Sequence, residues 1–131
     1  MAKILIIEDD ALLSRMYHIV FTSSKFKVDV AANGEEGFAK AQSILPDLIL
    51  LDIMMPKLNG LEVLRLLKAS SQTKAIPVVV LTNLAGSGDV KAALELGAVR
   101  YIVKSENKPQ QVHDIVAGIL AGANKKEAPE A

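Results

Sequence analysis

The side chains of this sequence that could carry out chemistry follow directly after short apolar runs. In chain order they are Glu8, Asp9, Asp10, Asp52, Thr82 and Lys104. Taken singly, each has an ordinary explanation, since an acidic residue before a helix is a common N-cap and a lysine is usually a solvated charge. If the apolar runs are parallel strands of one sheet, however, their carboxyl ends meet at one edge, where α/β proteins bind ligands. We therefore expect these six side chains to converge on one crevice.

Such a group is suited to phosphate chemistry with a divalent metal ion. The three clustered carboxylates of residues 8–10 repel one another, which raises at least one pKa unless a cation lies among them. With oxygen ligands only, that cation is expected to be Mg²⁺ or Mn²⁺. Asp52 is then a metal ligand, a nucleophile that forms an aspartyl phosphate, or both. Lys104 and Thr82 are placed to bind the oxygens of a transferred phosphoryl group.

Composition excludes several other classes of protein. The chain has 131 residues, of which 50% are hydrophobic, and this predicts one folded domain. Its 15 basic side chains are balanced by 15 acidic ones, so the protein has no net positive charge that would attract nucleic acid or an anionic membrane. The absence of cysteine excludes disulfides, zinc–thiolate sites and thiol catalysis. No apolar run approaches the ~18 residues of a membrane span. We expect a cytoplasmic protein that does not bind membranes or, directly, nucleic acid.

Apolar runs and helical periodicity alternate along the chain. The runs expected to form strands are residues 4–7, 28–31, 48–51, 78–81 and 101–103. The apolar stripes expected on the helices between and after them are Leu12, Met16, Ile19 and Val20; Phe38, Ala41 and Leu45; Val63, Leu64 and Leu67; Val90, Ala93 and Leu94, ended by Gly97; and Val112, Ile115, Val116, Ile119 and Leu120. This alternation predicts a doubly wound α/β fold, a five-stranded parallel sheet with helices on both faces.

The strand sequences also indicate their order. The run 28–31 alternates polar and apolar residues, and the run 101–103 lies between Arg100 and Lys104, so both are expected at the sheet edges. The order 2-1-3-4-5 satisfies this and places a topological switch point between strands one and three. We expect residues 1–122 to form the domain and residues 123–131, small and charged, to form a flexible tail.

Four stretches of the sequence resemble the receiver domain of bacterial two-component response regulators. They are ILIIEDD, PDLILLDIMMPKLNGLEVL, IPVVVLTN and GAVRYIVKS, in family order and at family spacing between about Lys3 and Leu120. The resemblance implies a flavodoxin-like fold and a stand-alone receiver like the chemotaxis regulator, whose sheet has the order given above.

The resemblance implies a role for each acidic residue. Asp52 corresponds to the phosphoacceptor. Glu8 and Asp9 correspond to the acidic pair that binds Mg²⁺ together with Asp52, while Asp10 is a spectator. Met54 contributes its backbone carbonyl to the metal.

The resemblance also implies a signalling cycle. A histidine kinase, a phosphotransfer protein or a small phosphodonor supplies the phosphoryl group, and the receiver catalyses its own phosphorylation and autodephosphorylation without being a conventional enzyme. Thr82 is the switch hydroxyl, Lys104 pairs with the phosphate and Tyr101 is the switch aromatic residue. Movement of these groups alters the face formed by helix four, strand five and helix five, which contacts an unknown downstream protein. The chain is expected to be a monomer or a weak phosphorylation-linked dimer.

Two features depart from the family pattern. Ser105 follows Lys104, where the family has a proline preceded by a cis peptide bond. A cis bond before a non-proline residue costs ~3–4 kcal/mol. We therefore expect a trans peptide here and a shifted loop over residues 104–108. Met54 and Leu84 are apolar where a polar side chain could orient water. We expect them to tune dephosphorylation and to make the aspartyl phosphate long-lived.

Other functions remain open. We expect this chain to carry no output domain; alternatively it is the N-terminal receiver of a longer regulator, or a degenerate receiver that only binds proteins. A haloacid-dehalogenase-type phosphohydrolase would need an aspartate where Met54 stands. A flavodoxin-like nucleotide binder would need a loop rich in Ser, Thr or Gly where the sequence has Glu8–Asp10.

Overall fold

The computed structural model describes residues 1–55, 59–83 and 88–127, the last five of these as backbone only. Its elements are β1 (Lys3–Ile7), α1 (Ala11–Ser23), β2 (Lys27–Ala31), α2 (Gly34–Ile44), β3 (Leu48–Asp52), α3 (Gly60–Ala69), β4 (Val78–Thr82), α4 (Gly88–Glu95), β5 (Arg100–Val103), a short 3₁₀ turn (Lys104–Glu106) and α5 (Pro109–Glu127). Each strand contains the apolar run from which it was predicted.

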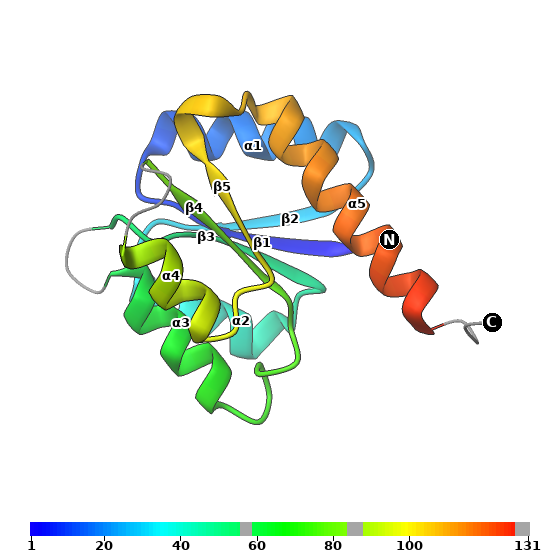
Figure 1. Cartoon of the computed structure of the whole chain (residues 1–131). Coiled ribbons are helices and arrows are strands. Elements are labelled where there is room, and N and C mark those ends of the chain that lie inside the picture. Colours follow the sequence, from blue (N-terminus) through cyan, green and yellow to red (C-terminus); the bar gives the residue numbers. More distant parts are fainter. Residues whose placement is uncertain (56–58, 84–87, 128–131) are drawn as a thin grey trace.

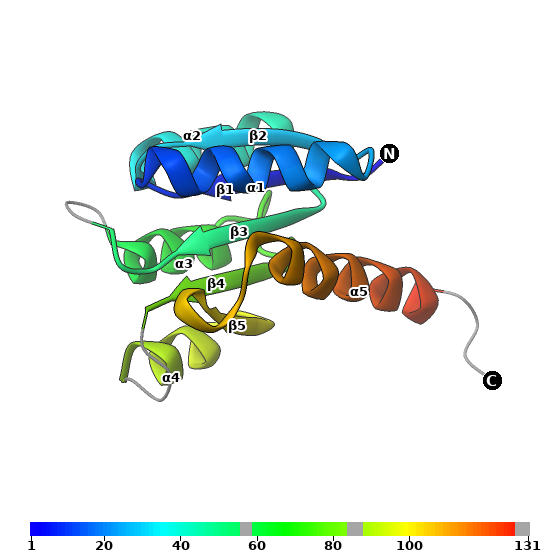
Figure 2. The same ribbon diagram turned by 90° about the horizontal axis from the view of Figure 1, so that it is seen from above.

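The strands form one parallel sheet in the order β2-β1-β3-β4-β5, which confirms the predicted topology. Helices α1 and α5 cover one face, and α2, α3 and α4 cover the other (Figure 1). Seen from above, the carboxyl ends of the strands lie at the end of the molecule opposite both chain termini (Figure 2). The predicted edge strands, β2 and β5, are indeed at the edges.

The sheet separates two apolar cores. Every residue of β3 and β4 is buried, and successive side chains point to opposite faces. On β1, Ile4 and Ile6 pack towards α1 and α5, whereas Leu5 and Ile7 pack towards α2 and α3. Because each fully buried side chain of this kind contributes about 1.5–3 kcal/mol, these strands hold the sheet rigidly beneath its carboxyl edge.

The predicted apolar stripe of α1 is wrong. Leu12, Met16 and Ile19 are 71%, 41% and 56% exposed, and the helix instead buries Tyr17 and Phe21. These two aromatic residues are also four positions apart, so they define a competing face. Because aromatic rings bury more apolar area than leucine or methionine, that face is the one directed towards the sheet.

Three further helix ends differ from or refine the prediction. Leu45 is exposed and ends α2 with a left-handed backbone (φ 47°), and Leu94 is 43% exposed on α4. Gly97 has a φ of 112°, which fits its predicted role of ending the fourth helix. Helix α5 continues to Glu127, past the predicted domain boundary at 122, and residues 128–131 lie outside the described part of the chain. The division into domain and tail stays a prediction.

No helix within the described residues is long and apolar enough to cross a membrane.

Candidate functional site

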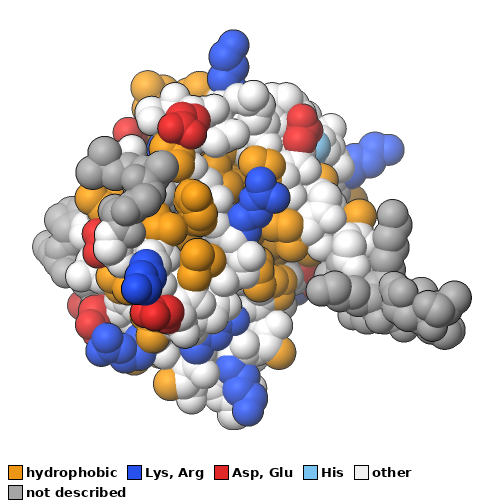
Figure 3. Space-filling view, viewed as in Figure 1, with side chains coloured by type: hydrophobic (Ala, Val, Ile, Leu, Met, Phe, Trp, Pro, Cys, Tyr) orange, Lys and Arg blue, Asp and Glu red, His pale blue; other side chains and the backbone are white. Residues whose placement is uncertain are grey.

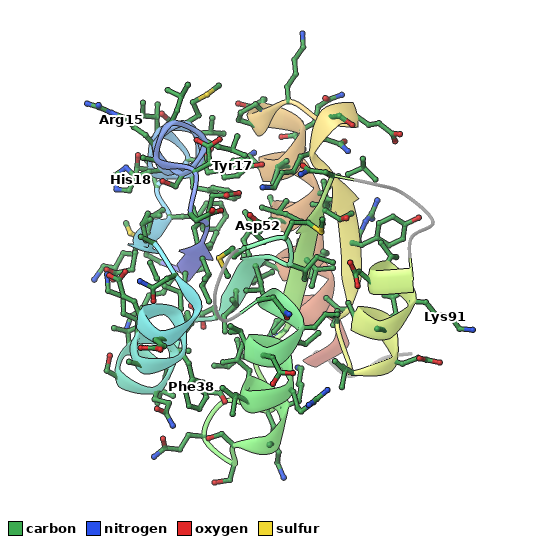
Figure 4. The ribbon with its side chains drawn as sticks, turned by 90° about the vertical axis from the view of Figure 1, so that its left-hand side faces the viewer. Arg15, Tyr17, His18, Phe38, Asp52 and Lys91 are labelled. Carbon is green, nitrogen blue, oxygen red and sulfur yellow. The ribbon has the colours of Figure 1, made fainter. Side chains whose placement is uncertain are left out.

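The carboxyl ends of β1, β3 and β4 bring the predicted site residues to one edge of the sheet. Asp52 is the last residue of β3 and Thr82 the last of β4, and these strands are neighbours. Glu8 follows β1 directly, and its backbone N–H continues the sheet by donating to the carbonyl of Ala31 at 3.0 Å. Figure 4 shows Asp52 near the centre of this edge. The sheet topology therefore brings Glu8, Asp52 and Thr82 to one edge, as expected from their strand-end positions.

Three carboxylates gather there closely enough to share one cation. Oxygen atoms of Glu8, Asp9 and Asp52 lie within 4.8 Å of one another. Glu8 and Asp52 are 1% and 2% exposed, whereas Asp9 is open to solvent. Hard oxygen ligands at this spacing suit Mg²⁺ or Mn²⁺, with water completing the coordination. These three residues therefore fit the predicted metal site.

Burial and charge repulsion shift the protonation of Glu8. The pKa of Glu8 is raised from 4.5 to about 7, chiefly because burial removes this side chain from water. The neighbouring Asp52 carboxylate adds to the increase, whereas the contacts with Lys104 and with the backbone of Asp10 oppose it. A carboxyl that is costly to ionise in the absence of a metal is stabilised in its charged form when a cation binds.

Lys104 supplies a positive charge within the protein itself. Its Nζ lies 2.8 Å from Glu8 Oε1 and 3.0 Å from Asp52 Oδ2, and its side chain is only 14% exposed. Burial acts to lower the pKa of Lys104, but the two carboxylates outweigh that effect and raise it. Lys104 therefore bridges the two buried carboxylates as an ammonium ion.

Backbone N–H groups occupy the other oxygens of the two buried acids. Met54 N–H donates to Asp52 Oδ1 at 2.9 Å, and Asp10 N–H donates to Glu8 Oε2 at 3.1 Å. Asp10 itself caps α1, accepting from Leu13 N–H at 3.1 Å. The backbone donors were not predicted, because side-chain types carry no signal for them.

Gly60 permits α3 to begin directly against the end of β3. A Cβ atom at this position would collide with the Asp52 carbonyl and with the backbone of Ile53. The side chain of Asn59 caps the helix by accepting from Glu62 N–H at 3.1 Å. Close packing of this helix start on the strand end therefore fixes the backbone that carries Asp52.

Tyr17 is a residue near the site that the sequence reasoning missed. It is 1% exposed and points inward from α1, whereas Arg15 and His18 point outward (Figure 4). Burial raises the pKa of the Tyr17 phenol, and the negative charges of Glu8 and Asp52 raise it further. The four-residue spacing of Tyr17 and Phe21 is the signal that could have revealed this.

The remaining predicted residues occupy different positions. Thr82 is fully buried at the end of β4. Met54 is 43% exposed at its side chain, and Leu84 lies outside the described residues. The Lys104–Ser105 peptide is trans, as predicted, and begins a 3₁₀ turn.

Tyr101 lies away from the carboxylates, on the outer surface. It is 38% exposed on β5 and lines a hollow of about 440 Å³ between β5, α4 and α5. Leu94 and Val99, which are 43% and 52% exposed, line the same hollow. Figure 3 shows apolar side chains gathered on this side of the molecule. Leu94, Val99 and Tyr101 therefore form the exposed apolar part of the lining of this hollow.

Comparison with known proteins assigns the architecture to a family. The family model of the response regulator receiver domain matches residues 4–117. Response regulator ArlR of Staphylococcus aureus is 36% identical over 121 residues, which make up 92% of this chain and 52% of ArlR. The chain thus spans about half the length of the curated relatives it matches.

Solved structures agree in fold over almost the whole chain. Chemotaxis response regulator CheY4 of Vibrio cholerae has a TM-score of 0.85 at 28% identity, covering 91% of this chain and 98% of CheY4. The Mn²⁺-bound form of response regulator Rcp1 has a TM-score of 0.73 at 34% identity, covering 91% of each chain. With the family match and the site geometry together, this chain belongs to the response regulator receiver domains of two-component signalling.

Proposed function

We propose that the chain is a phosphorylation-dependent switch that accepts a phosphoryl group on Asp52. The observation that carries the proposal is the position of the Asp52 carboxylate, buried at a strand end 3.0 Å from Lys104 Nζ and beside Glu8 and Asp9. The donor is the phosphohistidine of a kinase or phosphotransfer protein, or a small phosphodonor such as acetyl phosphate.

Glu8, Asp9 and Asp52 are the side chains that would hold Mg²⁺ or Mn²⁺, with the Met54 carbonyl as a backbone ligand. The Mn²⁺-bound state of Rcp1, a relative of similar fold, supports this choice of ion. When bound, the ion would neutralise negative charge on the transferred phosphoryl oxygens.

The protein's own groups position the reaction. An oxygen of Asp52 attacks phosphorus and forms the new O–P bond, while the bond from phosphorus to the donor nitrogen or oxygen breaks and the donor retains that electron pair. Lys104, which already contacts Asp52 Oδ2, pairs with a phosphoryl oxygen, and Thr82 donates a hydrogen bond to another. The Met54 N–H holds Asp52 Oδ1 in a fixed orientation.

The signal leaves through the face formed by α4, β5 and α5. Tyr101 packs inward as Thr82 approaches the phosphate, which changes the hollow lined by Leu94 and Val99. A population shift of this kind requires contacts that differ between the two states, and the phosphoryl group provides them. A downstream protein, or a second copy of the chain in a weak dimer, reads the change in the cytoplasm.

A second candidate is that this receiver controls further parts of a longer regulator. The match to relatives about twice as long favours it. The chemistry at Asp52 is the same in both cases, and the difference lies in whether the α4–β5–α5 face contacts a separate protein or another domain.

Intact mass spectrometry after incubation with acetyl phosphate and Mg²⁺ tests the proposal. We expect the mass of one added phosphoryl group, absent in Asp52→Asn and in the presence of EDTA. No gain in mass from acetyl phosphate, combined with no Mg²⁺-dependent binding of beryllofluoride, would instead support a degenerate receiver that only binds proteins.

The lifetime of the phosphorylated form tests the expected role of Met54. Its apolar, 43% exposed side chain offers no hydrogen bond to an attacking water molecule. We expect Met54→Asn to speed the loss of phosphate by roughly five- to tenfold, the effect of about one positioned hydrogen bond. Equal rates in the two proteins would refute this role.

A further inference from the structure

The connector between β5 and α5 aims Lys104 without the help of a proline. Lys104 begins a 3₁₀ turn through a trans peptide to Ser105. Ser105 and Glu106 are exposed, so burial of side chains does not fix the shape of this turn. Yet Lys104 Nζ must be held near two carboxylates at 2.8 and 3.0 Å. Something else in the connector has to hold its backbone.

Asn107 makes the contacts that close the turn. Its side-chain Nδ2 donates to the carbonyl of Val103, the last residue of β5, at 3.0 Å. Its backbone N–H is directed at the Lys104 carbonyl at 3.4 Å, a longer and weaker contact. The side-chain bond runs from one side of Lys104 to the other, so Lys104 lies inside the ring that this bond closes.

The next hydrogen bond along the connector has a different role. Gln111 Oε1 accepts from Lys108 N–H at 2.7 Å, and this contact organises the first turn of α5. It lies beyond the ring that contains Lys104. Gln111 therefore provides a matched control, a polar side chain in the first turn of α5 whose bond does not span Lys104.

We propose that Asn107 is a positioning residue that aims Lys104 at Asp52, through the bond from its side-chain amide to the Val103 carbonyl. The contribution of Asn107 to phosphoryl transfer rests on the function proposed above. The orientation of the Lys104 ammonium, by contrast, can be observed whether or not the protein is phosphorylated.

The first test observes Lys104 directly by NMR of the full chain labelled with ¹⁵N-lysine. An ammonium held by two buried carboxylates exchanges its protons slowly and gives its own signal, identified by its loss in Lys104→Met. We expect Asn107→Ala and Asn107→Asp to remove or shift this signal, because neither side chain can donate to the Val103 carbonyl. Gln111→Ala should leave it unchanged.

The second test measures the initial rate of phosphorylation by acetyl phosphate with Mg²⁺. Asn107→Ala should slow it about fivefold, the factor for one ordinary hydrogen bond. In a Lys104→Met background the same substitution should have no further effect, since Asn107 acts through Lys104.

The outcomes separate the two proposals. An unchanged Lys104 signal in Asn107→Ala would overturn the positioning role, as would an equal fivefold loss in the Lys104→Met background. A Lys104 signal that depends on Asn107 in a protein that takes up no phosphoryl group would support the positioning role and refute only the proposed function.

Discussion

Replacement of Lys104 by methionine removes the one cation that contacts both buried carboxylates in the described site. Lys104 Nζ is 2.8 Å from Glu8 and 3.0 Å from Asp52, and all three side chains are at least 86% buried. Loss of one partner from a buried ion pair costs about 3–5 kcal/mol, because the remaining charge is left uncompensated. Glu8, with a pKa of about 7, can take up a proton and so reduce that cost.

We therefore expect Lys104→Met to lose about 2–4 kcal/mol of unfolding free energy at pH 8 without metal, and less at pH 5.5. Mg²⁺ should restore more stability to the variant than it adds to the wild type. The reason is that Lys104 competes with the ion for the same oxygens, and a roughly tenfold gain in affinity corresponds to ~1.4 kcal/mol.

Urea denaturation at both pH values, with and without Mg²⁺, measures these differences. Lys91→Met is the matched control, because Lys91 is exposed and points away from the site (Figure 4). The reasoning would be refuted if Lys104→Met lost no more unfolding free energy than Lys91→Met. It would also be refuted if Mg²⁺ stabilised the Lys104→Met variant and the wild type equally.

Two further predictions concern pH and backbone packing. Burial raises the pKa of Glu8 to about 7 in the metal-free folded state, whereas the unfolded state loses this proton near pH 4.5. The folded state therefore binds the extra proton between these pH values, and the free energy of unfolding should fall by about 1–3 kcal/mol between pH 5 and pH 8. Glu8→Gln should flatten that profile in thermal melts, and an unchanged slope would contradict the assignment. Gly60→Ala should lower the free energy of unfolding by about 2–4 kcal/mol, because the new Cβ would collide with the end of β3. Gly118→Ala should instead raise the free energy of unfolding by about 0.5–1 kcal/mol, because nothing lies within 4 Å of the new Cβ. Similar melting temperatures for the two variants would refute this contrast.

The order of the strands could be predicted from the pattern of apolar residues in the sequence, but the buried face of α1 could not. The continuous apolar runs of β3 and β4 and the alternation in β2 can each be read from neighbouring residues. On α1, Leu12, Met16 and Ile19 formed one apolar stripe, and Tyr17 and Phe21 formed another. Which stripe is buried depends on the shape of the sheet and of α5, which α1 packs against, and periodicity carries no information about either.

The candidate site was predictable to the extent that it uses strand ends. Asp52, Glu8 and Thr82 were found because parallel strands deliver their carboxyl ends to one edge. The N–H of Met54 and the amide of Asn107 were not found, because their roles depend on the path of the backbone. Residue type alone does not reveal that path.

Chemical mapping of the phosphorylated residue tests the central claim most directly. The protein would be phosphorylated with acetyl phosphate and Mg²⁺, reduced with borohydride, which converts an aspartyl phosphate to homoserine, and analysed by peptide mass spectrometry. The account predicts homoserine at position 52 and aspartate at positions 9 and 10. Homoserine at another aspartate, or a stable phosphate on a serine, threonine or histidine with residue 52 unchanged, would contradict it.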